Sequence, residues 1–179
     1  MYPEKNSVVL VDENDRSLAS IDKMEAHELG LLHRAFSVFI FNAEGKMLIH
    51  QRAKSKYHCG GLWTNACCSH PYLFEEPKDA AKRRLKEELG FSCDVTKAFS
   101  FIYKAELDKG LTEHEYDHVF IGNYEGNINP NEDEVENYEY LDCEFLALEV
   151  KHFPDKFTPW FRIALPKVLE LVKKMGIAA

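Results

Sequence analysis

The chain has 179 residues, 45% of them hydrophobic and 29% charged, and its formal net charge is −8. This length and apolar content are typical of one globular domain with a sizeable core, so residues 1–179 are predicted to form a single domain. The acidic balance argues against a general nucleic-acid or membrane-surface binder, because such proteins normally present a basic surface.

The N-terminal residues and the cysteines indicate the compartment. The segment MYPEKNSVVLVDEND has neither the apolar core nor the basic leader of a secretory signal. No apolar run reaches the ~18 residues of a membrane span. The cysteines are odd in number, which favours free thiols: Cys59, Cys67, Cys68, Cys93 and Cys143. We therefore expect a reduced, cytoplasmic protein, either a monomer or a weak dimer.

The first elements in chain order are short. Residues 7–11 are predicted to form a strand, and residues 22–29 a helix with Asp22 as its N-cap and Gly30 as its stop. The runs RAFSVFIF and KMLIHQR flank the turn sequence NAEG, a pattern typical of a β-hairpin over residues 34–52.

Residues 53–75 are unusually rich in Gly, Cys, His, Trp, Asn and Pro, and carry polar chemistry that a purely structural loop does not need. A helix is predicted next, because Pro77 suits a first helical turn, the apolar line Ala81, Leu85 and Leu89 has helical spacing, and Gly90 ends it.

The remaining segments complete a mixed architecture. We predict strands over residues 98–107, 115–124 and 138–147, and an acidic loop over 125–137. A final amphipathic helix, kinked at Pro166, is predicted to begin at Thr158-Pro159 and to run from Trp160 to Met175. The fold class is therefore α/β or α+β, with a mixed β-sheet flanked by helices.

The segment from Ser69 to Phe91, SHPYLFEEPKDAAKRRLKEELGF, resembles the Nudix box. A helix of this kind presents carboxylates on successive turns, and such oxygens bind Mg²⁺, which in turn binds a diphosphate. The alternative is a solvated helix face with an Arg84–Glu88 ion pair, the usual interpretation of an isolated Glu-rich helix. The number of residues in register favours the Nudix box: Glu75, Arg83, Leu85, Glu87, Glu88, Gly90 and Phe91.

Two positions depart from the box. Ser69 stands where the box opens with Gly, and Arg84 stands where it has a Glu after Arg83. The second change replaces a metal-binding carboxylate with a cation. The segment is therefore predicted to bind a diphosphate but to be poorly equipped to hydrolyse it.

Further segments extend the resemblance to the type I isopentenyl-diphosphate isomerases. WTNACCSHP (residues 63–71) is similar to the segment that carries the essential cysteine of that family, and TEHEYDH (residues 112–118) to the segment with its essential glutamate. LLHRAFSVFIFN and the TPW near the C-terminus also resemble the family, so the likeness covers about residues 7–170. It implies a Nudix-like fold and conversion of isopentenyl diphosphate to dimethylallyl diphosphate, a step in isoprenoid precursor synthesis.

The resemblance also implies the catalytic residues. Cys68 is selected over Cys67 by its register with Ser-His-Pro, and Cys67 is expected to be a small buried hydrophobe. Glu115 is expected to transfer a proton on the other side of the substrate, with Tyr103 in the relay. Trp160 is expected either to stabilise a carbocation through its ring face or to be a core aromatic.

Strand alternation supports this assignment, because side chains two residues apart share a face. Cys68 and His70 would point the same way. Glu113, Glu115 and Asp117 would share one face of their strand, with His114, Tyr116 and His118 on the other.

The resemblance implies a tightly bound divalent metal, Mn²⁺, Zn²⁺ or Mg²⁺, held by His27, His33, His70, Glu113 and Glu115. Glu88 would hold a Mg²⁺ that accompanies the substrate diphosphate. The cations expected to bind that diphosphate are Lys23, Arg52, Lys56 and Arg84. The remaining histidines are expected to be ordinary surface or hydrogen-bonded residues: His50, His58, His114, His118 and His152.

Two other functions remain open from sequence. A Nudix hydrolase acting on a nucleotide or other diphosphate is the main alternative, and a catalytically silent metal- or diphosphate-binding module is a third. No Gly-rich dinucleotide fingerprint follows a predicted strand, so neither a flavin nor a nicotinamide cofactor is expected.

Overall fold

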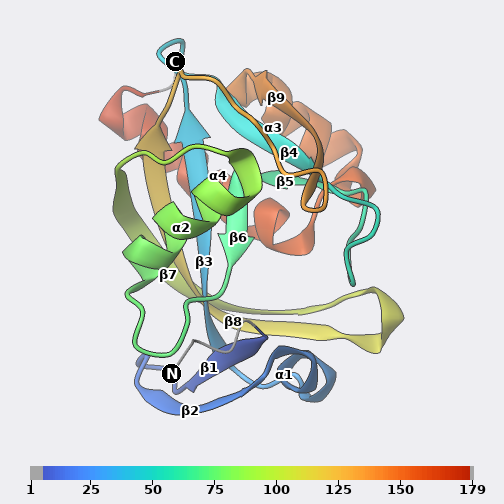
Figure 1. The fold of residues 1–179 in the computed structure, drawn as a ribbon. Coiled ribbons are helices and arrows are strands. Elements are labelled where there is room, and N and C mark those ends of the chain that lie inside the picture. The colour runs from blue at the N-terminus through green and yellow to red at the C-terminus, as the bar shows by residue number, and fades with distance from the viewer. Residues whose placement is uncertain (1–5, 178–179) are drawn as a thin grey trace.

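The computed structural model describes residues 6–177, and within them one nine-stranded mixed sheet is flanked by four α-helices (Figure 1). The strands are β1 (Ser7–Val11), β2 (Ser17–Asp22), β3 (His33–Phe41), β4 (Met47–Arg52), β5 (Trp63–Asn65), β6 (Cys67–Ser69), β7 (Val95–Glu106), β8 (Thr112–Asn123) and β9 (Val135–Leu141). The helices are α1 (Lys23–Leu29), α2 (Pro77–Leu89), α3 (Cys143–His152) and α4 (Pro159–Met175), with 3₁₀ turns η1 (Asp108–Gly110) and η2 (Pro154–Lys156).

Strand β3 is the central strand of the sheet. It pairs in parallel with β8 along its whole length, with His33 opposite Glu115. Its other edge pairs antiparallel with β1, β6 and β4 in turn, at successive positions. Segments that are distant in sequence therefore meet along one strand, which is how residues from both halves of the chain reach a common site.

The two faces of β3 are covered by different helices. Phe36, Val38 and Ile40 pack in one apolar cluster with the buried residues of α2. Phe39 and Phe41 pack in a second cluster with the buried residues of α4. This is the two-residue alternation of a strand buried on both faces. In Figure 1, α2 lies in front of β3 and α4 lies behind it.

The helix boundaries follow from local sequence. The Asp22 side chain accepts hydrogen bonds from Met24 N and Glu25 N, which satisfies donors at the start of α1. Gly30 ends α1 and Gly90 ends α2, each in the left-handed conformation that glycine adopts without strain. The predicted helices at 22–29, 77–90 and 158–175 are thus confirmed, and α4 is continuous with Pro166 inside it.

One predicted strand is right only in its first part, and four elements were missed, helix α3 among them. Residues 138–147 were expected to form a strand, but β9 ends at Leu141 and α3 begins at Cys143. Asp142 separates them, because its carboxylate accepts hydrogen bonds from Glu144 N and Phe145 N and so caps the helix. Strand β2 was not predicted, and neither were β5 and β6 within residues 53–75.

Among residues 6–177, no helix combines the length and apolar character needed to cross a membrane.

Candidate active site

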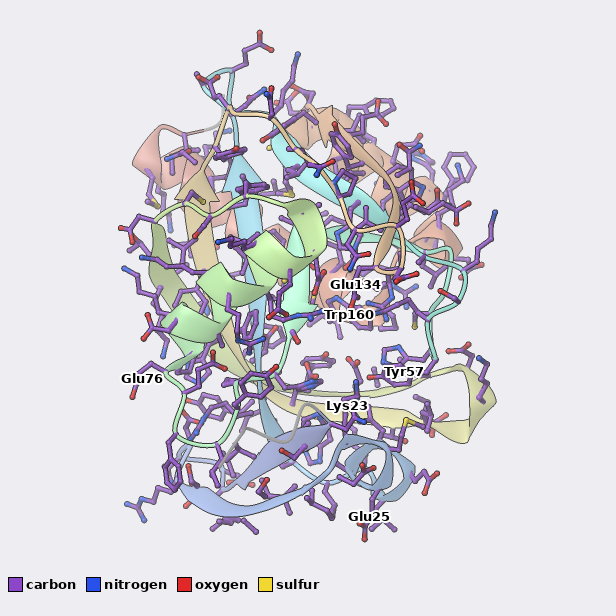
Figure 2. The ribbon with its side chains drawn as sticks, in the orientation of Figure 1. Lys23, Glu25, Tyr57, Glu76, Glu134 and Trp160 are labelled. Carbon is purple, nitrogen blue, oxygen red and sulfur yellow. The ribbon has the colours of Figure 1, made fainter. Side chains whose placement is uncertain are left out.

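A polar cavity opens beside β6 between α1, α2, α4 and the first residues of β8. Figure 2 shows four of its side chains, Lys23, Tyr57, Glu134 and Trp160, around this region, whereas Glu25 and Glu76 lie on the outside of the molecule. The lining consists of Lys23, His50, Arg52, Lys56, Tyr57, His58, Cys68, Ser69, His70, Arg84, Glu88, Glu113, Glu115, Glu134 and Trp160.

Most of the predicted site residues therefore share this cavity. His27, His33 and Tyr103 are not part of its lining, but they lie directly beneath it through contacts with Glu113 and Glu115. The alternation predicted for β8 is confirmed, because Glu113 and Glu115 both line the cavity while His118 contacts Asp15 elsewhere.

A cluster of imidazoles and carboxylate lies at the base of the cavity. Ligand atoms of His27, His33, His70 and Glu115 all lie within 4.8 Å of one another. His70 Nε2 is 2.9 Å and His33 Nε2 is 3.6 Å from Glu115 Oε1. The parallel pairing of β3 with β8 and the antiparallel pairing of β3 with β6 bring these residues together.

The hydrogen bonds of two of these rings leave one nitrogen free for a ligand. His27 Nδ1 is 2.6 Å from Lys23 O, and His33 Nδ1 is 2.8 Å from Leu31 O. A carbonyl only accepts, so each Nδ1 carries the proton and each Nε2 keeps its lone pair. Both Nε2 atoms are buried without a hydrogen-bond partner. Orphaned imidazole lone pairs beside a buried carboxylate are the donor set of a divalent transition metal, so these residues fit such an ion.

His58 departs from the prediction that it is an ordinary histidine. It is 2% exposed, and with His27 and Glu113 it forms a second group of atoms close enough to hold a metal. Its Nε2 lies 3.4 Å from Glu113 Oε1. The other four have local partners as expected: His50 with Ala66 O, His114 with Gly30 O, His118 with Asp15, and His152 with Leu148 O.

Tyr103 links the two glutamates of β8. Its hydroxyl lies 2.5 Å from Glu113 Oε2 and 2.6 Å from Glu115 Oε2. The hydroxyl has one proton, so it donates to one carboxylate and can accept a proton from the other. It therefore links Glu113 and Glu115 in one hydrogen-bonded chain. Burial and the neighbouring Glu115 carboxylate raise the pKa of Glu113. Burial alone would raise the pKa of Glu115, but the His70 imidazole, 2.9 Å from its Oε1, lowers it below its ordinary value.

The two adjacent cysteines face opposite sides of β6. Cys68 lines the cavity, and its Sγ is 3.0 Å from Asn65 Oδ1. Burial and the nearby Asp117 carboxylate raise the pKa of the Cys68 thiol. Cys67 is fully buried in the apolar cluster under α2, as predicted, and its Sγ is 3.5 Å from Glu88 Oε1.

The predicted phosphate-binding cations all line the cavity. Lys56 forms an ion pair with Glu134, and Arg84 Nη2 lies 3.3 Å from Glu134 Oε1 and 2.6 Å from Glu88 Oε1. Burial and the charges of Lys56 and Arg84 lower the pKa of Lys23, which shows how closely the positive charges are gathered. The sequence did not identify Glu134, which lies in the predicted acidic loop without a motif of its own.

Trp160 is both a core aromatic and a residue of the cavity, the two alternatives considered for it. It is 3% exposed and packs in the apolar cluster under α4, yet it also lines the cavity. The Arg52 guanidinium lies 5.3 Å from the centroid of its ring. The ring therefore forms part of one wall of the cavity.

The Nudix-like segment is centred on α2. Arg83 Nε and Nη2 donate to the two carboxylate oxygens of Glu75, both at 2.7 Å. This bidentate pair ties the preceding loop to the helix, while Arg84 and Glu88 face the cavity.

The chain matches the NUDIX domain family over residues 31–161. It is 43% identical over 175 residues to isopentenyl-diphosphate Delta-isomerase 2 of Aromatoleum aromaticum, covering 98% of this chain and 93% of that protein. It is 46% identical over 161 residues to isopentenyl-diphosphate Delta-isomerase of Pectobacterium atrosepticum, covering 90% of each.

Solved structures agree on the fold. A Deinococcus radiodurans protein superposes with a TM-score of 0.75 at 16% identity, over 90% of this chain and 98% of that one. A Nudix hydrolase from M. smegmatis superposes with a TM-score of 0.59 at 15% identity, over 96% of each chain. From the sequence identity over nearly its whole length, this chain belongs to the isopentenyl-diphosphate Delta-isomerase family and carries a NUDIX domain.

Proposed function

We propose that this enzyme converts isopentenyl diphosphate to dimethylallyl diphosphate. The observation that carries the proposal is that Cys68 and Glu115 line one cavity together with the cations Lys23, Lys56 and Arg84. The names of the curated relatives point to the same reaction.

The reaction moves a carbon–carbon double bond, so one carbon gains a proton while another loses one. An unactivated alkene is a weak base, and its protonation needs an acid held against it and a base on the other side. Glu115 and Tyr103 supply one proton-transfer group in this proposal, and Cys68 supplies the other. Microscopic reversibility gives each both roles, one in each direction.

The surroundings suit a carbocation-like transition state. The Trp160 ring forms an aromatic wall of the cavity, and an aromatic face attracts positive charge. The reaction also requires that water be kept away from the cation, because water would otherwise capture it.

The tightly bound metal is proposed to be held by His27, His33, His70, Glu113 and Glu115. A Mn²⁺, Zn²⁺ or Mg²⁺ ion there would supply positive charge that offsets the repulsion between the two buried carboxylates. The diphosphate is proposed to bind Lys23, Arg52, Lys56 and Arg84, with Glu88 beside its accompanying Mg²⁺.

The hydrolase alternative is less well supported. Arg84 occupies a carboxylate position of the Nudix box and contacts both Glu88 and Glu134. It therefore places a cation where a hydrolase would gather negative charge for its metal ions. We further propose that residues 1–179 act as one domain in the cytoplasm, as a monomer or weak dimer.

The test is direct. Purified protein is incubated with isopentenyl diphosphate and Mg²⁺, and the carbon skeleton is followed by NMR. Appearance of dimethylallyl diphosphate is expected, while phosphate release without that product would favour the hydrolase.

A further inference from the structure

Two fully buried polar residues of β5, Thr64 and Asn65, lie between Cys68 and Trp160. Neither lines the cavity. Burying a hydroxyl and an amide is unfavourable unless every polar atom finds a partner, so their partners indicate what the pair is for.

The Asn65 amide has only one possible orientation. Its Nδ2 donates to Val38 O at 3.0 Å and to Cys67 O at 2.8 Å. Both partners are carbonyls, which only accept, so these two bonds use both amide protons. Oδ1 must therefore face the other way, where the Cys68 thiol donates to it across 3.0 Å.

The Thr64 hydroxyl joins this amide to the tryptophan. Trp160 Nε1 donates to Thr64 Oγ1 at 2.9 Å, and Thr64 Oγ1 donates to Asn65 Oδ1 at 3.0 Å. Thr158 Oγ1, 2.9 Å away, can donate to the remaining lone pair. In this arrangement the proton and both lone pairs of the hydroxyl have partners, and Cys68 Sγ lies 3.8 Å from the same oxygen.

We propose that Thr64 and Asn65 are positioning residues that fix the Cys68 thiol and the Trp160 indole relative to each other. The proposal rests on the isomerase function proposed above. The hydrogen bond from the indole N–H fixes the rotation of the Trp160 ring, which lines the cavity. The hydrogen bond from the thiol fixes the direction of the Cys68 sulfur, which exchanges a proton. A displacement of about 1 Å at such groups can lower a rate by about 100-fold.

The kinetic test uses isosteric variants. Thr64→Val keeps the shape of the side chain and removes the hydroxyl, so kcat should fall by about 10- to 100-fold. KM should stay near the wild-type value, because the cations that would bind the diphosphate are untouched. Thr64→Ser restores the hydroxyl and should recover most of kcat. Asn65→Leu removes the thiol acceptor and should lower kcat in the same way.

A matched control separates positioning from loss of stability. Leu146→Ala removes a buried side chain of α3 that belongs to the same apolar cluster as Trp160 but does not line the cavity. If Leu146→Ala lowers kcat as much as Thr64→Val at an equal loss of Tm, or if Thr64→Ser fails to recover the rate, the proposal is overturned.

Two further measurements do not require isomerase activity. Iodoacetamide labelling of Cys68, followed by peptide mass spectrometry at one fixed pH, should be faster in Asn65→Leu, because the sulfur loses its acceptor and can turn toward the cavity. Trp160 emission, measured in a Trp63→Phe background, should shift in Thr64→Val, because the indole N–H loses its acceptor.

Unchanged labelling and unchanged emission would overturn the positioning proposal. If the wild-type protein had no isomerase activity but labelling and emission both changed in the variants, the positioning of the two groups would be supported. Only the proposed reaction would then be contradicted.

Discussion

Cys67 and Cys68 differ in environment although they are neighbours in sequence. One faces the apolar cluster under α2, and the other faces the cavity. Cys68→Ala should therefore lose nearly all turnover, about 10²- to 10⁴-fold, the usual contribution of a positioned proton-transfer group. Cys67→Ala should keep turnover close to wild type. Steady-state assays with circular dichroism as a check on folding test this, and wild-type rates in Cys68→Ala would refute the assignment.

A second prediction concerns the carboxylate end of the cavity. Glu115→Gln keeps the size of the side chain but cannot release a proton, so turnover should be nearly abolished while the fold persists. Tyr103→Phe breaks the hydrogen-bond link between Glu113 and Glu115 and should lower kcat by a smaller factor. Equal rates for wild type and Glu115→Gln in a product assay would contradict the proposed role.

At the residue scale, sequence resemblance identified the residues that lie in recognisable motifs. Cys68, His70 and Glu115 fall in such segments, and the structure gathers them in or beneath one cavity. His58 and Glu134 were missed because their roles depend on contacts across the fold. Each lies in a loop without periodicity, and only the folded chain brings His58 to Glu113 and Glu134 to Lys56.

At the scale of elements, Gly90 at the end of α2 and Gly110 in η1 form a matched pair of sites for substitution. Gly90 has φ +76°, and a Cβ there would lie 2.4 Å from Asn129 O. Gly110 has a similar φ of +75°, but no described atom lies within 4 Å of such a Cβ. Both Ala variants incur the left-handed backbone cost of about 1–2 kcal/mol, and Gly90→Ala adds a steric clash of about 1–3 kcal/mol.

Urea unfolding should therefore rank the variants as wild type, Gly110→Ala and Gly90→Ala in order of falling stability. Equal losses in the two variants would show that the contact with Asn129 contributes nothing.

Helices with clear caps were the elements best predicted from sequence. Each of four residues has a local reason to start or end a helix, and α1 and α2 begin and end at them: Asp22, Gly30, Pro77 and Gly90. The run 138–147 was mispredicted because its aromatic residues favour a strand, while the single cap at Asp142 decides the outcome. Strands β5 and β6 are three residues each, too short for a periodic pattern to reveal them.

At the scale of the whole molecule, the cluster of candidate metal ligands joins α1, β3 and β8 to His70, which directly follows β6. An ion bound only by the folded state should stabilise it, by about 2.7 kcal/mol at a concentration 100 times Kd. Exhaustive chelation should abolish activity and lower Tm, and Mn²⁺, Zn²⁺ or Mg²⁺ should restore both.

Thermal unfolding of wild type, His33→Ala and His152→Ala with and without added ion tests this prediction. His33→Ala should lose the response to metal, whereas His152→Ala, far from the cluster in sequence and bonded to Leu148 O, should keep it. If chelation changed neither the Tm nor the activity of the wild-type protein, the proposed metal site would be contradicted.

The parallel pairing of β3 with β8 sets an order of events during synthesis. His27, His33 and His70 leave the ribosome long before Glu113 and Glu115, and β8 must reach β3 before His33 lies opposite Glu115. A nascent chain halted before Thr112 thus carries three imidazoles but neither carboxylate of the cluster. Loading of the proposed ion is consequently expected late in biogenesis, coupled to completion of the sheet.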